Sequence, residues 1–149
     1  MKKDIILAGV GGQGILTIAT IIGEAAAKAG VNLKQAEVHG MSQRGGDVQS
    51  TLRLSTEPIY SDLIREGAAD LIISMEPMEA LRYVPYLDEE GWIVTSSHPF
   101  KNIPNYPDEH QLMAELEPPW DDSFHPAKTA PAQPRHPRCR EPHRWAYHQ

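Results

Sequence analysis

The chain has 149 residues, a formal net charge of −6 and a pI near 5.6. This length suits one domain with a hydrophobic core, and the acidic balance argues against a dedicated nucleic-acid binder, which needs a basic surface. The single cysteine, Cys139, excludes an internal disulfide and the set of thiolates that an iron-sulfur cluster requires. The first apolar run is too short and too interrupted for a signal peptide or a membrane span, so we expect a cytoplasmic protein with no membrane contact.

Strand and helix signals alternate from the start of the chain. Residues 5–10 are almost continuously apolar, which is typical of a strand buried on both faces of a parallel sheet. Apolar residues then recur at helical spacing up to Ala29, and Gly30 is placed to end that helix in a left-handed conformation. Residues 33–38 are a weaker strand candidate. Residues 47–55 alternate between apolar and polar, so one face of that strand is expected to meet water or a partner.

The same alternation continues to residue 116. The expected elements are a short antiparallel strand at 59–60, a brief helix that Ser61 caps and Gly67 ends, a buried strand at 69–76, a helix that begins at Pro77 and ends or kinks at Pro85, a strand at 91–97 and an amphipathic helix at 107–116. Glu76 and Glu79 are interpreted as surface acids that compensate a helix dipole. Together these elements predict an α/β fold, Rossmann-like and three-layered, with a mostly parallel sheet.

The composition changes after Leu116. The remaining residues contain no Ile, Leu, Val or Met, and seven of the thirteen prolines lie there. Too little apolar surface is available to offset the entropy of ordering, so residues 118–149 are predicted to be a disordered, proline-rich tail that follows a domain of residues 1–117. Two explanations stay open: a linker or partner-binding tail, or a changed reading frame that leaves the C-terminal part of the fold missing or altered.

A glycine-rich turn joins the first strand to the first helix. Gly9, Gly11 and Gly14 satisfy the G-x-G-x-x-G spacing, which leaves amide groups at a helix N-terminus available to a phosphate or another anion. Dinucleotide binding also requires an acid at the end of the second strand for the ribose hydroxyls, and Glu37 is suitably placed. A free-standing NAD- or FAD-binding oxidoreductase is therefore one hypothesis.

The stretch "EVHGMSQRGGDVQS", residues 37–50, is unlike a dinucleotide-binding domain. Its glycines prevent a helix, and its side chains are rich in hydrogen-bond donors. Arg44 is best suited to a carboxylate or phosphate, because its planar guanidinium donates paired hydrogen bonds and stays charged. Ser42 and Gln43 add neutral hydrogen bonds, and His39 is a candidate for proton exchange near neutral pH. The alternative is that the glycines only let the chain turn, while Arg44 pairs with an acid.

Four motifs occur in the order of a known family: "GVGGQGILT", "EVHGMSQRGGDVQS", "ADLIISMEPMEALR" and "PYLDEEGWIVTSS…IPNYP". Together they resemble the small, gamma-type subunit of 2-oxoacid:ferredoxin oxidoreductases, over roughly residues 4–116. The "HGMSQRGG" version is similar to the beta subunit of indolepyruvate:ferredoxin oxidoreductase. This resemblance implies a large (alpha) partner subunit with thiamine diphosphate and iron-sulfur clusters. It also implies oxidative decarboxylation of aryl pyruvates with coenzyme A and ferredoxin to give aryl-acetyl-CoA.

The resemblance further implies that this chain alone binds no cofactor and no metal, because it lacks the thiamine diphosphate pattern and a cysteine cluster. The small domain resembles a cover beside the thiamine site that helps to admit coenzyme A. A third hypothesis is an inactive, truncated interaction module. The residues expected on this basis to bind substrate or coenzyme A are Gly11, Gly12, Gln13, Gly14, Ser42, Gln43 and Arg44.

Overall fold

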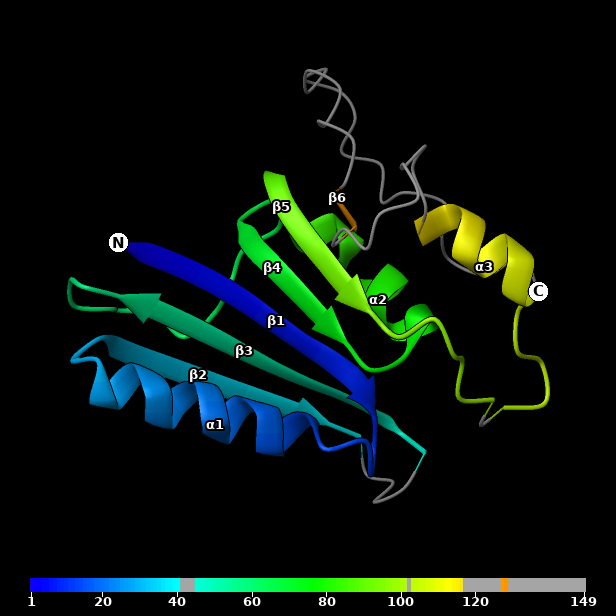
Figure 1. Cartoon of the computed structure of the whole chain (residues 1–149), viewed down its shortest axis with the longest axis horizontal. Helices are drawn as coiled ribbons and strands as arrows, with labels where there is room; N and C mark the ends of the chain where they lie inside the picture. Colours follow the sequence, from blue (N-terminus) through cyan, green and yellow to red (C-terminus); the bar gives the residue numbers. More distant parts are fainter. Residues whose placement is uncertain (41–44, 102, 117–126, 129–149) are drawn as a thin grey trace.

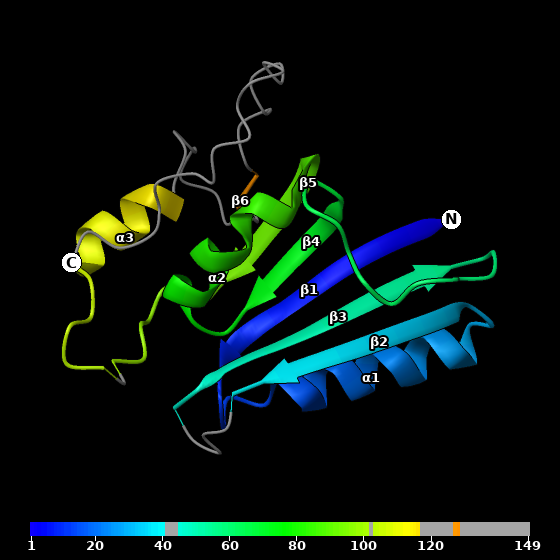
Figure 2. The same cartoon turned by 180° about the vertical axis from the view of Figure 1, so that it is seen from behind.

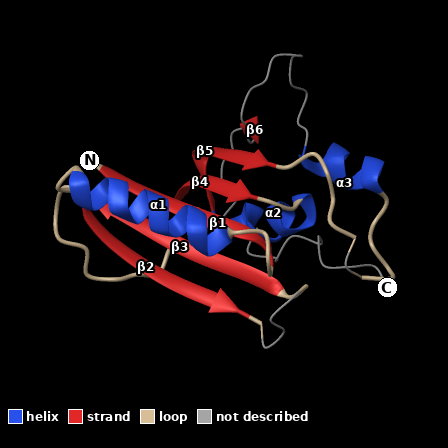
Figure 3. Ribbon diagram, turned by 60° about the horizontal axis from the view of Figure 1, so that its bottom comes forward, coloured by secondary structure: helices blue, strands red, loops and turns tan. Residues whose placement is uncertain are grey.

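The computed structural model describes residues 1–40, 45–101, 103–116 and 127–128, and its centre is one β-sheet with helices on both faces (Figure 1, Figure 3). The elements in chain order are β1 (Lys2–Val10), α1 (Ile15–Lys28), β2 (Asn32–His39), β3 (Asp47–Ser55), β4 (Ala69–Ser74), α2 (Pro77–Tyr83), the 3-10 helix η1 (Val84–Tyr86), β5 (Leu87–Thr95), α3 (Glu109–Leu116) and β6 (Ala127–Lys128). No helix in these ranges is long and apolar enough to cross a membrane.

The strand order is β2-β3-β1-β4-β5-β6. β1, β4 and β5 are parallel neighbours, whereas β3 runs antiparallel to both β1 and β2, so β2 points in the same direction as β1. The two-residue β6 pairs antiparallel with β5. The α/β class is confirmed. The sheet is mixed, because the antiparallel β3 is inserted between two strands of common direction, as Figure 2 shows from behind.

β1 supplies both layers of the core. Its residues Ile5 and Leu7 pack with α1 and with Leu52 of β3 on one face. Its residues Ile6 and Ala8 face the other way and pack in the cluster that includes α2. This is the pattern predicted for a strand buried on both faces, and it makes β1 the central strand to which the other elements are attached.

Most helix ends agree with the sequence signals. Gly30 has a φ of 68° directly after α1 ends, and Pro77 occupies the first turn of α2. α2 ends at Tyr83, before Pro85, as expected. α3 begins at Glu109, and the Asp108 carboxylate accepts two N–H groups of its first turn, each at 3.1 Å.

The strand predicted at 59–60 and the helix predicted at 61–67 are wrong, since neither forms. The cause lies in β3. The guanidinium of Arg53 donates from Nη1 to the carbonyl oxygens of Ser61 and Leu63, both at 3.0 Å. These bonds hold the segment across β3 in an irregular conformation.

The predicted tail, residues 118–149, lies outside the described residues apart from β6. The proposed boundary after residue 117 therefore stays a prediction.

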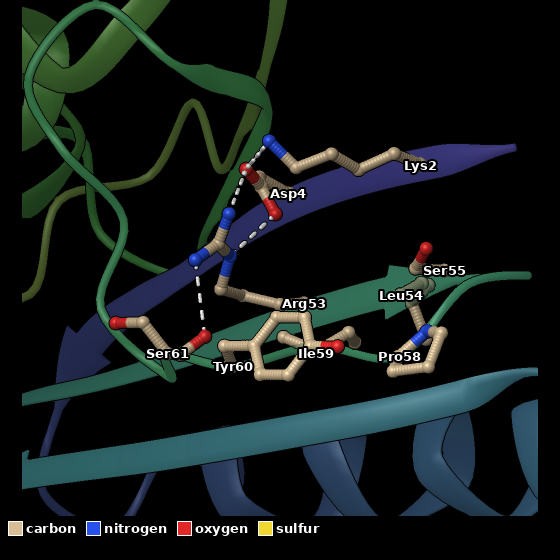
Figure 4. A pocket seen from close by; sticks show the side chains of 9 residues that line it. All are labelled: Lys2, Asp4, Arg53, Leu54, Ser55, Pro58, Ile59, Tyr60 and Ser61. Carbon is tan, nitrogen blue, oxygen red and sulfur yellow. Dashed lines mark hydrogen bonds and ion pairs between the residues drawn. The ribbon is translucent and has the colours of Figure 1, made fainter.

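A buried ion pair joins β1 to β3 near the amino end of β1 (Figure 4). The Asp4 side chain is only 1% exposed, and its carboxylate accepts from Arg53 Nε at 2.9 Å and from Nη2 at 3.2 Å. Lys2 Nζ lies 2.9 Å from Asp4 Oδ2. Burial by itself would raise the pKa of Asp4, but the hydrogen bonds and charges of Arg53 and Lys2 outweigh it and hold this pKa below its usual value.

Arg53→Met should lower the free energy of unfolding by about 3 kcal/mol, because it leaves a buried carboxylate with a weaker set of partners. The folded-state pKa of Asp4 is depressed, so its stabilisation is complete above the unfolded pKa of about 4 and is lost as the pH falls through the folded value. Urea unfolding at about pH 7 and about pH 3 should show the loss shrinking in acid. The exposed Arg65→Met is the matched control. A loss that is equal at both pH values would contradict this account.

Candidate functional site

The two glycine-bearing turns lie side by side at one edge of the sheet. The Gly11 N–H donates to the Gly46 carbonyl oxygen at 2.8 Å. The β1–β3 pairing extends to Val10 opposite Asp47, and the Gly40 N–H donates to the Asp47 carbonyl at 3.2 Å. The turn after β1 and both described ends of the loop between β2 and β3 are therefore adjacent.

At this edge the connections after two neighbouring parallel strands leave on opposite faces of the sheet. β1 continues into α1 on one face, and its parallel neighbour β4 continues into α2 on the opposite face (Figure 1, Figure 3). Open α/β sheets bind ligands outside the carboxyl ends of two such strands, because the connections diverge there. The glycine turn lies at this position.

The glycines of the turn serve two different purposes. Gly12 and Gly14 have φ values of 99° and 83°, which only glycine adopts readily, and a Cβ at either would meet nothing within 4 Å. Gly9 instead permits close packing, since a Cβ there would lie 2.9 Å from both Gln13 Oε1 and Ile15 Cδ1. Gly12 and Gly14 are exposed, so their side of the turn is open to a ligand.

The start of α1 has no side-chain cap. Its N-cap residue is Gly14, and the first turn contains no acidic residue. Within the described residues, the N–H groups of Gly12 and Gly14 have no hydrogen-bond acceptor. Amide groups at the start of a helix favour negative charge, so this turn suits a carboxylate or a phosphate.

The Gln13 side chain is engaged by the protein at both of its polar atoms. Its Oε1 accepts from the Val10 N–H at 2.8 Å, and its Nε2 donates to the Met75 carbonyl at 3.3 Å. The Met75 N–H in turn donates to the Ala8 carbonyl at 2.9 Å. Gln13 therefore braces the end of β1 against the junction of β4 and α2, a role that the sequence did not indicate.

Glu76 is fully buried, so its interpretation as a surface acid is wrong. It is the N-cap of α2, and its Oε2 accepts from the Glu79 N–H at 3.0 Å. Its Oε1 accepts from the Phe100 N–H at 3.3 Å and from the Tyr106 hydroxyl. The position before Pro77 was the available sequence signal, because the residue before a first-turn proline is where a helix cap is expected.

Glu79 is also buried rather than on the surface, with 3% exposure. Its Oε2 lies 3.1 Å from Nε of Arg82, one turn along α2. Burial raises the pKa of Glu79, and the charge of Arg82 opposes this only in part. The acids at the start of α2 thus belong to the interior of the fold, although they do lie where the helix dipole favours them.

The second loop is described only at its ends. His39 is exposed at the end of β2, opposite Val48 in the strand register. Gly45 has a φ of 78°, which is consistent with the turn expected there. The remaining expected ligand contacts of this loop, Ser42, Gln43 and Arg44, lie outside the described residues.

Glu37 does not have the position that a dinucleotide site requires. In dinucleotide-binding domains the strand with the ribose-binding acid lies directly beside the strand that enters the glycine turn. Here β3 separates β2 from β1. Glu37 instead accepts a hydrogen bond from Gln35 Nε2 at 2.5 Å on its own strand. The glycine spacing is thus present without the strand order that gives it its dinucleotide meaning.

These features define a Rossmann-like domain with an anion-compatible turn but without the strand order of dinucleotide-binding domains. The sequence profile described as pyruvate ferredoxin/flavodoxin oxidoreductase matches residues 4–130, and the chain belongs to this family. The resemblance drawn from the four motifs is confirmed.

Curated relatives agree with this assignment. The chain is 49% identical over 104 residues to the indolepyruvate oxidoreductase subunit IorB of Thermococcus kodakarensis, with 69% of this chain and 51% of that protein covered. It is 40% identical over 124 residues to the subunit of the same name from Archaeoglobus fulgidus, with 78% of this chain and 60% of that protein covered. The chain therefore spans about half of the first relative and three-fifths of the second.

Solved structures show a similar fold. The 2-oxoglutarate:ferredoxin oxidoreductase from Magnetococcus marinus, determined with 2-oxoglutarate, coenzyme A and succinyl-CoA bound, matches with a TM-score of 0.57 at 22% identity. The match covers 72% of this chain and 18% of that one. At this identity the likeness concerns the fold alone.

Gln13→Leu is expected to lower the free energy of unfolding by about 1–2 kcal/mol, because the Val10 N–H and the Met75 carbonyl lose their partner while the side-chain volume is kept. Urea unfolding with an unchanged m value would measure it. Thr20→Val is the control, since it removes one exposed hydroxyl from α1 and should change little. A Gln13→Leu chain as stable as the wild type would show that the brace is unimportant.

Proposed function

We propose that this chain is the small subunit of a heteromeric indolepyruvate:ferredoxin oxidoreductase. The complex would oxidatively decarboxylate aryl pyruvates to aryl-acetyl-CoA and reduce ferredoxin. Membership of the family and the identity to indolepyruvate oxidoreductase subunits support this. The observation that supports it is the meeting of the two glycine-bearing turns at the switch point. This polar, anion-compatible edge would face the large subunit.

The proposal assigns the cofactors to the large (alpha) subunit. With a single cysteine this chain is not suited to hold an iron-sulfur cluster. Thiamine diphosphate would stabilise the carbanion that decarboxylation creates, and clusters would carry electrons to ferredoxin. This chain would contribute binding and orientation, and would work in the cytoplasm with the large subunit as its direct partner.

The glycine turn and the second loop would share the binding of anionic groups. The exposed amides of Gly12 and Gly14, beside Gly11, suit a substrate carboxylate or the phosphates of coenzyme A. Arg44, with Ser42 and Gln43 beside it, would add a charged, planar donor from the facing loop. These residues position groups rather than react with them. His39, exposed at the end of β2, is the candidate for proton exchange.

A free-standing NAD- or FAD-binding oxidoreductase accounts for fewer observations. It rests on the glycine spacing and on Glu37, and β3 removes Glu37 from the strand next to the turn. An inactive interaction module would share the fold and the partner, but its complex would not turn over. Turnover and nucleotide binding therefore separate the three functions.

Arg44→Ala, tested in the complex co-purified with the large subunit, should reduce kcat/KM for oxoacid and coenzyme A by about 10- to 100-fold. This is the effect expected when one charge-assisted hydrogen bond to a bound anion is lost. Assembly should be unchanged by gel filtration. The exposed Arg65→Ala is the control and should retain wild-type kinetics. Wild-type kinetics in the Arg44 variant would remove this residue from the site.

The isolated chain should bind NADH no more tightly than a Kd of about 1 mM, close to non-specific binding. Fluorescence titration with NADH measures this directly. Saturation in the micromolar range would favour the dinucleotide-binding function instead.

A further inference from the structure

We propose that Glu76 is a positioning residue, whose buried carboxylate ties the segment after β5 to the β4–α2 junction and thereby fixes the glycine turn at the candidate site. This role rests on the proposed function, since it concerns the same edge of the sheet. Glu76, Phe100 and Tyr106 together form the Glu76 cluster.

Glu76 joins parts of the chain that are distant in sequence. Its carboxylate accepts the Glu79 N–H from α2 at 3.0 Å and the Phe100 N–H at 3.3 Å. It also accepts the hydroxyl of Tyr106, thirty residues along the chain. Phe100 and Tyr106 belong to the long connection between β5 and α3, which runs past the start of α2 in Figure 1 and Figure 2.

Helix capping alone does not explain a glutamate at this position. Ser, Thr, Asn or Asp would cap α2 equally well with a smaller side chain. A fully buried carboxylate is costly unless several donors satisfy it, and Glu76 has three, drawn from two separate segments. The three hydrogen bonds of Glu76 therefore hold the β5–α3 connection against α2, in addition to capping the helix.

A second set of bonds leads from Glu76 to the glycine turn. The Glu76 N–H donates to Ser74 Oγ at 3.2 Å, and Ser74 Oγ donates to the Glu76 carbonyl at 2.6 Å, which fixes the tight turn after β4. Within this turn the Met75 carbonyl accepts from Gln13 Nε2. Any shift of Glu76 thus moves the acceptor on which Gln13 rests, and Gln13 holds the turn that contains Gly12 and Gly14.

The chemistry of Tyr106 agrees with this arrangement. Burial, and then the hydrogen bond and negative charge of Glu76, raise the pKa of the Tyr106 hydroxyl well above its usual value. The hydroxyl therefore stays protonated and remains a donor to Glu76 across the neutral range.

The bonding can be tested directly on the full chain by amide hydrogen exchange. In Glu76→Gln, the Phe100 N–H should exchange about tenfold faster or more, because one side-chain acceptor atom replaces two and the hydroxyl competes for it. In Tyr106→Phe, which removes a single hydroxyl and is the safer variant for folding, Phe100 should also exchange faster while the Glu79 N–H keeps its protection. Tyr60→Phe, with Tyr60 91% exposed, is the matched control. Unchanged exchange at Phe100 in both variants would overturn the cluster.

The positioning role is tested by kinetics of the complex with the large subunit. Glu76→Gln and Tyr106→Phe should raise KM for coenzyme A by about fivefold or more and leave kcat within about twofold, because binding geometry is lost while the chemistry stays on the partner. A merely structural defect would instead lower kcat through loss of active complex at unchanged KM. Faster exchange at Phe100 with an unchanged KM would overturn the positioning role.

A wild-type complex without turnover would overturn the proposed function itself, whereas the exchange experiment still decides whether the cluster exists.

Discussion

The antiparallel pairing of β3 with β1, which extends from Lys2 opposite Ser55 to Val10 opposite Asp47, is the constraint on which the candidate site depends. A parallel neighbour would begin at the opposite edge of the sheet, and the loop that enters it would lie there too. Because β3 runs the other way, it begins where β1 ends. The loop between β2 and β3 therefore returns to the glycine turn, and the Gly11–Gly46 hydrogen bond is a direct result. The same insertion moves Glu37 one strand away, so one topological change both builds the polar edge and removes the ribose-binding position.

Local signals predicted much of the fold. The apolar run of β1, the helical spacing of α1, Gly30 after it and Pro77 at the start of α2 all depend on a few neighbouring residues, and all agree with the structure. The prediction for residues 59–67 was wrong because the conformation of this segment depends on Arg53, a side chain on another element. The mixed character of the sheet was likewise not readable from β3 itself, since an alternating strand fits either direction of pairing.

The candidate site likewise has some features that the local sequence predicts and others that depend on remote residues. The glycine turn was predictable, because its conformation requires glycine wherever it is built. Gln13 and Glu76 were not, since their partners Met75, Phe100 and Tyr106 are remote in sequence. A glutamate at a helix start is usually exposed to solvent. Glu76 is buried here, with three hydrogen-bond donors, because the β5–α3 connection packs against the start of α2.

The glycine at the start of α1 has a thermodynamic consequence. Helices commonly carry their own side-chain acceptor at this position, and this one does not. An anionic group that binds at the turn would supply this acceptor, so binding would make the turn more rigid, and affinity and local order would rise together. Occupancy at this edge would then be transmitted along α1, which packs on β1, β2 and β3.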